Sequence, residues 1–226
     1  MFASSRVFAD RSEAGRRLAE RLARFKSEQP LVLALPRGGV PVGFEVARAL
    51  DAPLDLILVR KIGAPFQPEL AIGAVVDGDQ AETVLNRDLV ADLQIAEGYV
   101  ERERARQLEE IERRRRLYAA GRPRIDVRDR TAIVVDDGIA TGATVEAALC
   151  AVRRAGPRCL VLAVPVAPRD TLERLRPQLD EIECLMTPHF LGAIGMFYAD
   201  FDQLSDGEVV ALLERAAARG SGQGGA

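Results

Sequence analysis

Tryptophan is absent from this chain of 226 residues, and histidine occurs once, at His189. Cysteine is scarce as well, because Cys150, Cys159 and Cys184 are the only three and they lie far apart in apolar stretches. Structural zinc sites need clustered cysteine and histidine ligands, and small secreted domains need paired cysteines. The sequence has neither pattern, so we interpret the cysteines as reduced core residues.

A strong excess of one sign of charge is also missing. Lysine and arginine total 31, aspartate and glutamate total 34, and the formal net charge is −3. This balance excludes a global basic field that would recruit nucleic acid or an anionic membrane. Local basic clusters remain able to bind a small phosphorylated molecule. We therefore expect no nucleic-acid partner.

No apolar run is long enough to cross a bilayer. The longest ones, such as LVLAVPVA at 160–167, fall far short of the roughly 20 residues that a membrane helix needs. Near the start, FADRSEAGRRLAERL at 8–22 has the pattern of an amphipathic helix rather than that of a signal peptide. We expect a cytoplasmic protein without a membrane partner.

What the chain does contain is an alternation of short apolar runs and helix-like segments. Strands are predicted at 31–36, 54–62, 131–135, 159–167 and 181–186, with helices between most of them. Continuous apolar strands separated by helices imply an α/β protein with a doubly wound, mainly parallel sheet covered on both faces. Ligands of such sheets collect at the carboxyl ends of the strands.

The stretch at about 63–128 departs from this alternation. It has a hairpin signal at 71–86 and then a long polar helix pattern at 87–119. Oppositely charged residues four apart, such as Glu110 and Arg114, support an exposed helix face. The alternatives are a dimer arm or a mobile lid. We interpret 1–219 as one domain containing this insertion, and 220–226 as a disordered tail.

Residues 134–144 read VVDDGIATGAT and form the most informative stretch. An apolar strand runs into the adjacent carboxylates Asp136 and Asp137, and a loop of small residues leads into a helix. A helix amino terminus with free amides binds phosphate. The two acids would repel phosphate but are suited to accept hydrogen bonds from a vicinal diol. A ribose 5-phosphate offers both groups.

Other phosphate loops fit this stretch less well. The nucleoside-triphosphate loop requires a lysine that is missing here, and the dinucleotide fingerprint G-x-G-x-x-G is absent. An acidic pocket of the response-regulator kind needs a separate phosphoacceptor, for which Asp55 is a weak candidate. A plain helix cap does not call for two consecutive acids at a buried strand end.

The string VVDDGIATGAT resembles the signature of the type I phosphoribosyltransferases, which bind 5-phosphoribosyl 1-pyrophosphate (PRPP). The string PRGG at 36–39 resembles the pyrophosphate loop of that family, and the pair at 60–61 is similar to a basic pair of its purine-salvage members. The resemblance implies that the acids hold the ribose hydroxyls. The PRPP contacts that it implies are Arg37, Gly38, Gly39, Arg60, Lys61, Asp136, Asp137, Gly138, Ala140, Thr141, Gly142, Ala143 and Thr144.

The whole chain also resembles a group of uncharacterised predicted phosphoribosyltransferases. The shared features include FADRSEAGRRLAERL, LPRGGVPVG, AVPVAP and FYADFDQLSDGEVV. The resemblance implies the type I phosphoribosyltransferase fold, with the hairpin-plus-helix insertion where the family has its flexible loop. It also implies a carboxyl-terminal hood at about 186–204, and we expect a homo-oligomer, a dimer.

The implied reaction transfers the phosphoribosyl group of PRPP to a nitrogen acceptor, a nucleobase, with release of pyrophosphate. Mg²⁺ is the implied cofactor, with Asp136 and Asp137 as its ligands. Those two acids, Arg37 and Lys61 are the predicted catalytic residues. The alternative is a regulator of the same fold that senses PRPP or nucleotides without turnover. A hydrolase-like use of the same pocket is the third reading.

The acceptor is expected between the loop at 165–170 and the hood. Its predicted contacts are Phe190, Phe197 and Tyr198, which could stack on a flat base, and Asp170, which could accept from a base N–H. The alternative is that the aromatic rings pack the hood onto the core and that Asp170 caps a helix. His189 is either an acid–base group near neutral pH or a structural residue.

Overall fold

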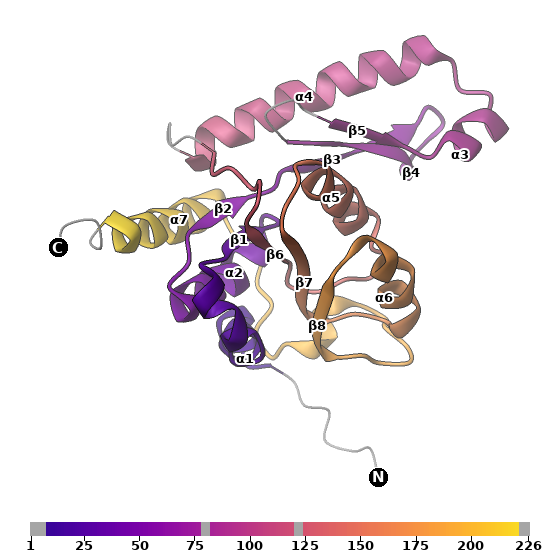
Figure 1. Cartoon of the computed structure of the whole chain (residues 1–226). Coiled ribbons are helices and arrows are strands. Elements are labelled where there is room, and N and C mark those ends of the chain that lie inside the picture. Colours follow the sequence, from indigo (N-terminus) through magenta and orange to yellow (C-terminus); the bar gives the residue numbers. More distant parts are fainter. Residues whose placement is uncertain (1–7, 78–81, 120–123, 222–226) are drawn as a thin grey trace.

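A central sheet of five parallel strands organises the molecule (Figure 1). The computed structural model describes residues 8–77, 82–119 and 124–221. The strand order is β2-β1-β6-β7-β8, and every neighbouring pair is parallel. The strands are β1 (Leu31–Ala34), β2 (Leu54–Leu56), β6 (Thr131–Val135), β7 (Cys159–Val166) and β8 (Glu181–Met186). The predicted parallel sheet is confirmed.

Helices cover both faces of this sheet, because alternate residues of a strand point to opposite sides. One face packs against α1 (Arg11–Leu22) and α2 (Gly39–Leu50). The other face packs against α5 (Ala143–Arg154) and α6 (Arg169–Leu175). All five residues of β6 are buried between these two layers. The acid pair that follows β6 is therefore anchored in the centre of the fold.

Outside the insertion, the described residues also contain short helical turns and a last helix. The 3-10 turns found there are η1 (Ala23–Glu28), η2 (Arg176–Gln178) and η3 (Ile194–Phe197). Helix α7 (Asp206–Ser221) begins with the predicted capping box, in which Ser205 and Glu208 bond each other's backbone amides. Since α7 continues through Ser221, the predicted tail starts too early, and residues 222–226 lie outside the described residues.

A second, antiparallel sheet accounts for the insertion. Its order is β3 (Val59–Ala64), β4 (Gln67–Val76) and β5 (Glu82–Leu85). The hairpin predicted between the last two strands is confirmed. The single strand predicted at 54–62 is wrong, because β2 ends at Leu56 and the chain then joins this other sheet.

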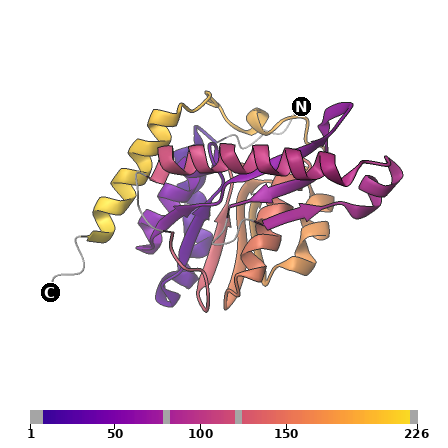
Figure 2. The ribbon, with the colours of Figure 1, turned by 90° about the horizontal axis from the view of Figure 1, so that it is seen from above.

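Two helices complete the insertion: α3 (Arg87–Asp92) and α4 (Glu97–Ala119). Helix α4 lies across the strands of the second sheet, as Figure 2 shows from above. The long helix predicted at 87–119 is thus interrupted between α3 and α4. On α4, Glu110 pairs with Arg114 four residues away at 2.7 Å, as the charge pattern indicates.

The segment after β8 returns to the beginning of the described chain. The amide of Phe8 donates to the carbonyl of Phe197 at 2.8 Å, and the amide of Ala199 donates to the carbonyl of Phe8 at 2.7 Å. Phe8 is completely buried in this contact. The helix that the sequence predicted from residue 8 begins only at Arg11, after its N-cap residue Asp10. The hood is therefore joined to the start of α1.

No helix within the described ranges combines the length and the apolar character that crossing a bilayer requires.

Candidate active site

The two motifs meet at one edge of the central sheet. Strands β1 and β6 are neighbours and run parallel, so the loops that follow them leave the same edge. We call residues 36–39 the PRGG turn and Asp136 with Asp137 the acid pair. The Pro36–Arg37 peptide bond in the turn is cis. Helix α2 begins at Gly39, the last residue of this turn.

The PRGG turn approaches the acid pair so closely that only glycine fits. A Cβ atom added to Gly38 would lie 2.0 Å from Oδ2 of Asp137. One added to Gly39 would lie 2.7 Å from the carbonyl oxygen of Val135. Any side chain at these positions would displace the acid pair or the end of β6. The sequence predicted that these glycines serve a ligand. The structure adds that Gly38 makes room for Asp137 and that Gly39 makes room for the end of β6 and Asp136.

The acid pair is held within the fold. Oδ1 of Asp136 accepts from the amide of Asp137 at 2.9 Å, and Asp137 is only 8 % exposed. Burial raises the pKa of Asp136 well above its ordinary value, and the Asp137 carboxylate adds to this rise. Burial also raises the pKa of Asp137, while the guanidinium of Arg11 opposes that rise. A ligand that donates hydrogen bonds or brings positive charge would stabilise the two carboxylates together.

The loop after the acid pair opens toward solvent at its far end. Gly138 is covered, since an added Cβ would lie 2.6 Å from Cγ2 of Ile194 in the hood. Ala140, Thr141 and Ala143 are exposed. These three residues thus form an accessible rim next to Asp137, which is buried, and Asp136, which is half-buried.

Helix α5 starts in this rim without a side-chain cap. Its N-cap residue is Gly142, with a left-handed φ of 81°, and no side chain accepts from the first-turn amides. Those amides have no acceptor within the helix. An anion is the natural partner for them, because the helix dipole adds to their positive character.

Helix α6 holds the same loop from outside. The hydroxyl of Thr171 donates to the carbonyl of Ala140 at 3.2 Å, and Nη2 of Arg174 donates to the carbonyl of Thr141 at 2.5 Å. Arg174 also pairs with Glu146 of α5. Sequence analysis missed Thr171 and Arg174. Their spacing of three indicates a shared helix face, but nothing local indicates what that face contacts.

The basic residues assigned to pyrophosphate are divided between two places. Arg37 is half-buried in the PRGG turn. Arg60 and Lys61 lie inside β3 rather than at a strand end, which corrects the sequence assignment of their position. Nε of Arg60 donates to Oε1 of Gln107 on α4 at 3.1 Å. Burial, and then the nearby charge of Arg114, lower the pKa of Arg60.

Tyr198 has a different position from the one the sequence suggested. Its ring is buried, with centroid distances of 5.4 Å to Phe8 and 4.9 Å to Phe201. Its hydroxyl donates to the carbonyl of Asp137 at 2.5 Å. A ring enclosed in this way has no free face for a base, so Tyr198 attaches the hood to the acid pair instead of stacking on the acceptor.

The other predicted acceptor residues lie at the surface of the same region. Phe190 is 85 % exposed, Phe197 is half-buried, and His189 is exposed. Asp170 is exposed in the first turn of α6, where its Oδ1 accepts from the amide of Thr171 at 2.9 Å. Phe190 and Asp170 remain accessible to a ligand.

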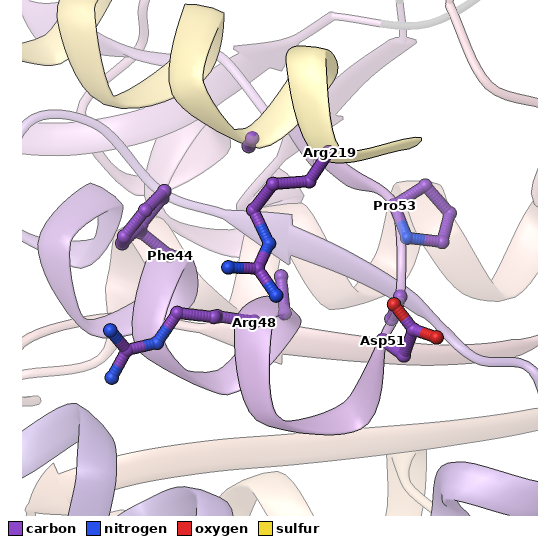
Figure 3. Close-up of a pocket in the computed structure, with 8 residues that line it drawn as sticks. Phe44, Arg48, Asp51, Pro53 and Arg219 are labelled. Carbon is purple, nitrogen blue, oxygen red and sulfur yellow. The ribbon is translucent and has the colours of Figure 1, made fainter. Parts of the chain in front are cut away.

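A separate cavity of about 270 Å³ lies between α2 and α7 (Figure 3). Its lining includes Phe44, Arg48, Asp51, Pro53 and Arg219. Arg48 and Asp51 mark the carboxyl end of α2, whereas the PRGG turn precedes its amino end. Since α2 has 12 residues, its ends are about 18 Å apart. This cavity is therefore distinct from the site at the acid pair.

The parallel sheet has an acid pair, a glycine turn and an open helix amino terminus at one edge, which is where α/β proteins of this class bind their ligands. Residues 10–197 match the family model described as "Phosphoribosyl transferase domain". The chain belongs to this family, as its VVDDGIATGAT and PRGG strings suggested.

Individual relatives agree with the family assignment. Two Mycobacterium tuberculosis proteins, from strains CDC 1551 / Oshkosh and ATCC 25618 / H37Rv, are each named "Putative phosphoribosyl transferase" and are 48% identical over 211 residues. The match covers 93% of this chain and 47% of each relative, so the chain spans about half of their length. The crystal structure of TT1426 from Thermus thermophilus is 45% identical, has a TM-score of 0.80, and is matched over 92% of this chain and 98% of that one. The predicted fold is thereby confirmed.

Proposed function

We propose that the protein is a Mg²⁺-dependent phosphoribosyltransferase that transfers the 5-phosphoribosyl group of PRPP to a nitrogen acceptor, a nucleobase, and releases pyrophosphate. One observation carries the proposal: the acid pair, the PRGG turn and the open amino terminus of α5 surround the same edge of the sheet. PRPP has a group for each of them, namely ribose hydroxyls, pyrophosphate and 5′-phosphate.

Binding follows from the groups that this edge offers. The amides at the start of α5 and the hydroxyls of Thr141 and Thr144 would donate to the 5′-phosphate. The acid pair would accept from the 2′- and 3′-hydroxyls of the ribose. Because α6 fixes the loop carbonyls and the glycine turn abuts Asp137, both subsites are preorganised. Such positioning lowers the barrier without covalent catalysis.

The reaction breaks the bond between C1 of the ribose and the pyrophosphate oxygen and forms a bond between C1 and the acceptor nitrogen. The bonding electrons leave with pyrophosphate, and the acceptor nitrogen loses its proton. Arg37 and the amides of the PRGG turn stabilise the charge that develops on the leaving group. Arg60 and Lys61 remain predicted contacts of pyrophosphate, for which Arg60 would exchange its bond with Gln107.

The residues present fit a magnesium ion that arrives with the substrate. Asp136 and Asp137 supply carboxylate oxygens, and Mg²⁺ commonly binds one or two carboxylates together with substrate phosphates. No group of three or more histidine, cysteine, aspartate or glutamate side chains suited to a metal occurs among the described residues. When bound, the ion would neutralise charge on the leaving pyrophosphate.

The acceptor would lie between the start of α6 and the hood. The exposed ring of Phe190 is available to stack on a flat base, and Asp170 is available to accept from a base N–H. Phe197, whose ring is half-buried, stays a predicted contact of the base. A homodimer and a cytoplasmic location stay predictions from the sequence.

An activity assay with a panel of purines, pyrimidines and other nitrogen heterocycles tests the proposal. We expect pyrophosphate release that requires PRPP, Mg²⁺ and one class of base. Asp137→Asn should lower kcat/KM by about 10²-fold, because it removes one preorganised charge from the site. A chelator should abolish turnover.

Each other result points to a different function. Tight binding of PRPP without turnover indicates a sensor, and loss of PRPP that no base accelerates indicates a hydrolase. An Asp137→Asn variant as active as the wild type refutes the assignment of the site.

A further inference from the structure

Arg11 links the acid pair to both ends of the described chain. Its Nε donates to Oδ2 of Asp137 at 2.8 Å, and its Nη1 donates to the carbonyl of Asp202 at 2.9 Å. The centre of the guanidinium lies 3.8 Å from the centroid of the Phe201 ring. The planar guanidinium group of arginine can donate to two acceptors in its plane while its face stacks on an aromatic ring, which lysine cannot do. The side chain is 12% exposed, so these contacts are largely shielded from water.

Oδ2 of Asp137 is thereby in contact with two elements besides its own loop. Nε of Arg11 on α1 donates to it, and Gly38 of the PRGG turn approaches it so closely that a Cβ atom there would lie 2.0 Å away. Tyr198 holds the backbone of the same residue through its carbonyl oxygen. The position of Asp137 thus depends on α1 and the hood as well as on β6.

Arg11 also changes the charge that the acid pair offers to a ligand. Two adjacent carboxylates repel each other in a buried place, and a guanidinium in contact with one of them balances one charge. The remaining oxygen of Asp137 and the carboxylate of Asp136 are left to meet the ligand. Arg11 itself contacts Asp137, Asp202 and Phe201, and its Nε and Nη1 each donate a hydrogen bond there.

We propose that Arg11 is a positioning residue for PRPP, which sets the place where Asp137 meets the ribose by clamping it against the PRGG turn. The inference rests on the proposed function. Arg11 acts through Asp137, so its removal should weaken the binding of PRPP and not that of the acceptor.

The variant Arg11→Met tests the inference in the full chain. Methionine keeps apolar contact with Phe201 but removes the charge and both donors. We expect KM for PRPP to rise about tenfold or more and kcat/KM to fall about 10²-fold. KM for the acceptor should stay within about twofold of the wild-type value. An unfolded fraction would lower kcat alone and would change neither KM.

A lysine variant separates position from charge. Arg11→Lys keeps the charge but lacks the fork, so we expect it to recover only part of the lost kcat/KM. Full recovery would mean that charge balance alone is needed, and it would overturn the positioning role.

Arg17 provides a matched control on the same helix. Its guanidinium lies 4.8 Å from the ring centroid of Phe8, a ring of the same aromatic cluster, and its side-chain ion pair is with Glu13 rather than with Asp137. Arg17→Met should keep the wild-type KM for PRPP. If it raises this KM as much as Arg11→Met does, general loosening of α1 explains both effects and the inference fails.

A double-mutant cycle tests the contact without any assay of turnover. Urea unfolding is measured for Arg11→Met, Asp137→Asn and the double variant. We expect non-additive effects, with Asp137→Asn restoring part of the stability that Arg11→Met loses, because an unpaired buried carboxylate disappears. Additive effects would show that the pair does not interact.

The two proposals fail in different ways. If the wild type is active and Arg11→Met has the wild-type KM for PRPP, the role of Arg11 is refuted and the proposed function stands. A wild type that binds PRPP without turnover refutes the enzyme, and the dissociation constant then replaces KM in the comparison. A wild type that neither binds nor consumes PRPP refutes both.

Discussion

At the scale of single residues, the site depends on the absence of a side chain at two glycines. Gly38 and Gly39 permit the end of β6 and the acid pair to approach the start of α2 at distances that a Cβ atom would occupy. The local strings PRGG and VVDDGIATGAT could be recognised from sequence because each is continuous. Arg11 and Tyr198 could not, because their contacts with Asp137 span 126 and 61 residues of chain.

The variant Gly38→Ala should therefore disable the site while leaving the fold largely intact. The added methyl group would meet Oδ2 of Asp137 and force the carboxylate away from its place. We expect kcat/KM for PRPP to fall about 10²-fold or more. Steady-state kinetics and circular dichroism together check this outcome.

Gly207→Ala is the control for that substitution. Gly207 lies in α7, and an added Cβ would come no nearer than 3.9 Å to Oγ of Ser205. Alanine at this helical position should keep wild-type kinetics and stabilise the protein slightly. Equal losses of activity in the two variants would contradict the special role of Gly38.

At the scale of elements, the two strands that end at the site were predicted to within two residues, because their apolar runs are continuous and buried on both faces. The run at 54–62 was misassigned for a physical reason. The chain passes from β2 to β3 without a glycine or proline, and only the change of pairing partner marks the break. Pairing is a non-local property, so the local pattern could not show that Arg60 and Lys61 belong to the second sheet.

The insertion is tied to α7 by a buried hydroxyl. Tyr118 of α4 donates to Oδ1 of Asp206 at 2.6 Å, and burial, followed by this hydrogen bond, raises the pKa of Tyr118 to about 12. An unfolded tyrosine titrates near 10. The stabilisation from this group is therefore complete below about pH 10 and is lost as the pH rises from about 10 to 12.

Thermal unfolding of the wild type and of Tyr118→Phe tests this link. The melting temperatures are compared between about pH 8 and pH 11.5, an interval that includes the ordinary tyrosine pKa of about 10. Phenylalanine cannot ionise, so the stability of the variant should fall less steeply above pH 10 than that of the wild type. Parallel curves would show that Tyr118 does not couple α4 to α7.

At the scale of the whole molecule, the hood and the start of α1 form one structural unit on the site. Phe8 exchanges two backbone hydrogen bonds with the hood and packs its ring against Tyr198. The sequence indicated an aromatic cluster in the hood and left open whether it stacks on a base or packs the hood down. The ring that packs against Tyr198 is that of Phe8, which lies about 190 residues earlier in the chain. A contact so distant in sequence cannot be recognised from the local pattern.

Phe8→Ala should loosen this unit. Removing a fully buried phenylalanine ring costs about 3 to 5 kcal/mol in the free energy of unfolding. We expect a lower midpoint in urea and faster hydrogen exchange of the Ala199 amide, which donates to the carbonyl of Phe8. Unchanged exchange at Ala199 would contradict the attachment of the hood through residue 8.

The hydroxyl of Tyr198 reaches an acid that the ribosome makes 61 residues earlier. At ordinary speeds of translation the nascent chain waits roughly 3 to 12 seconds between the two. During that interval PRGG and VVDDGIATGAT are made, while the hood residue that holds the backbone of Asp137 is still missing. A transcript cut short before this tyrosine would encode both strings and still yield an acid pair without its attachment to the hood.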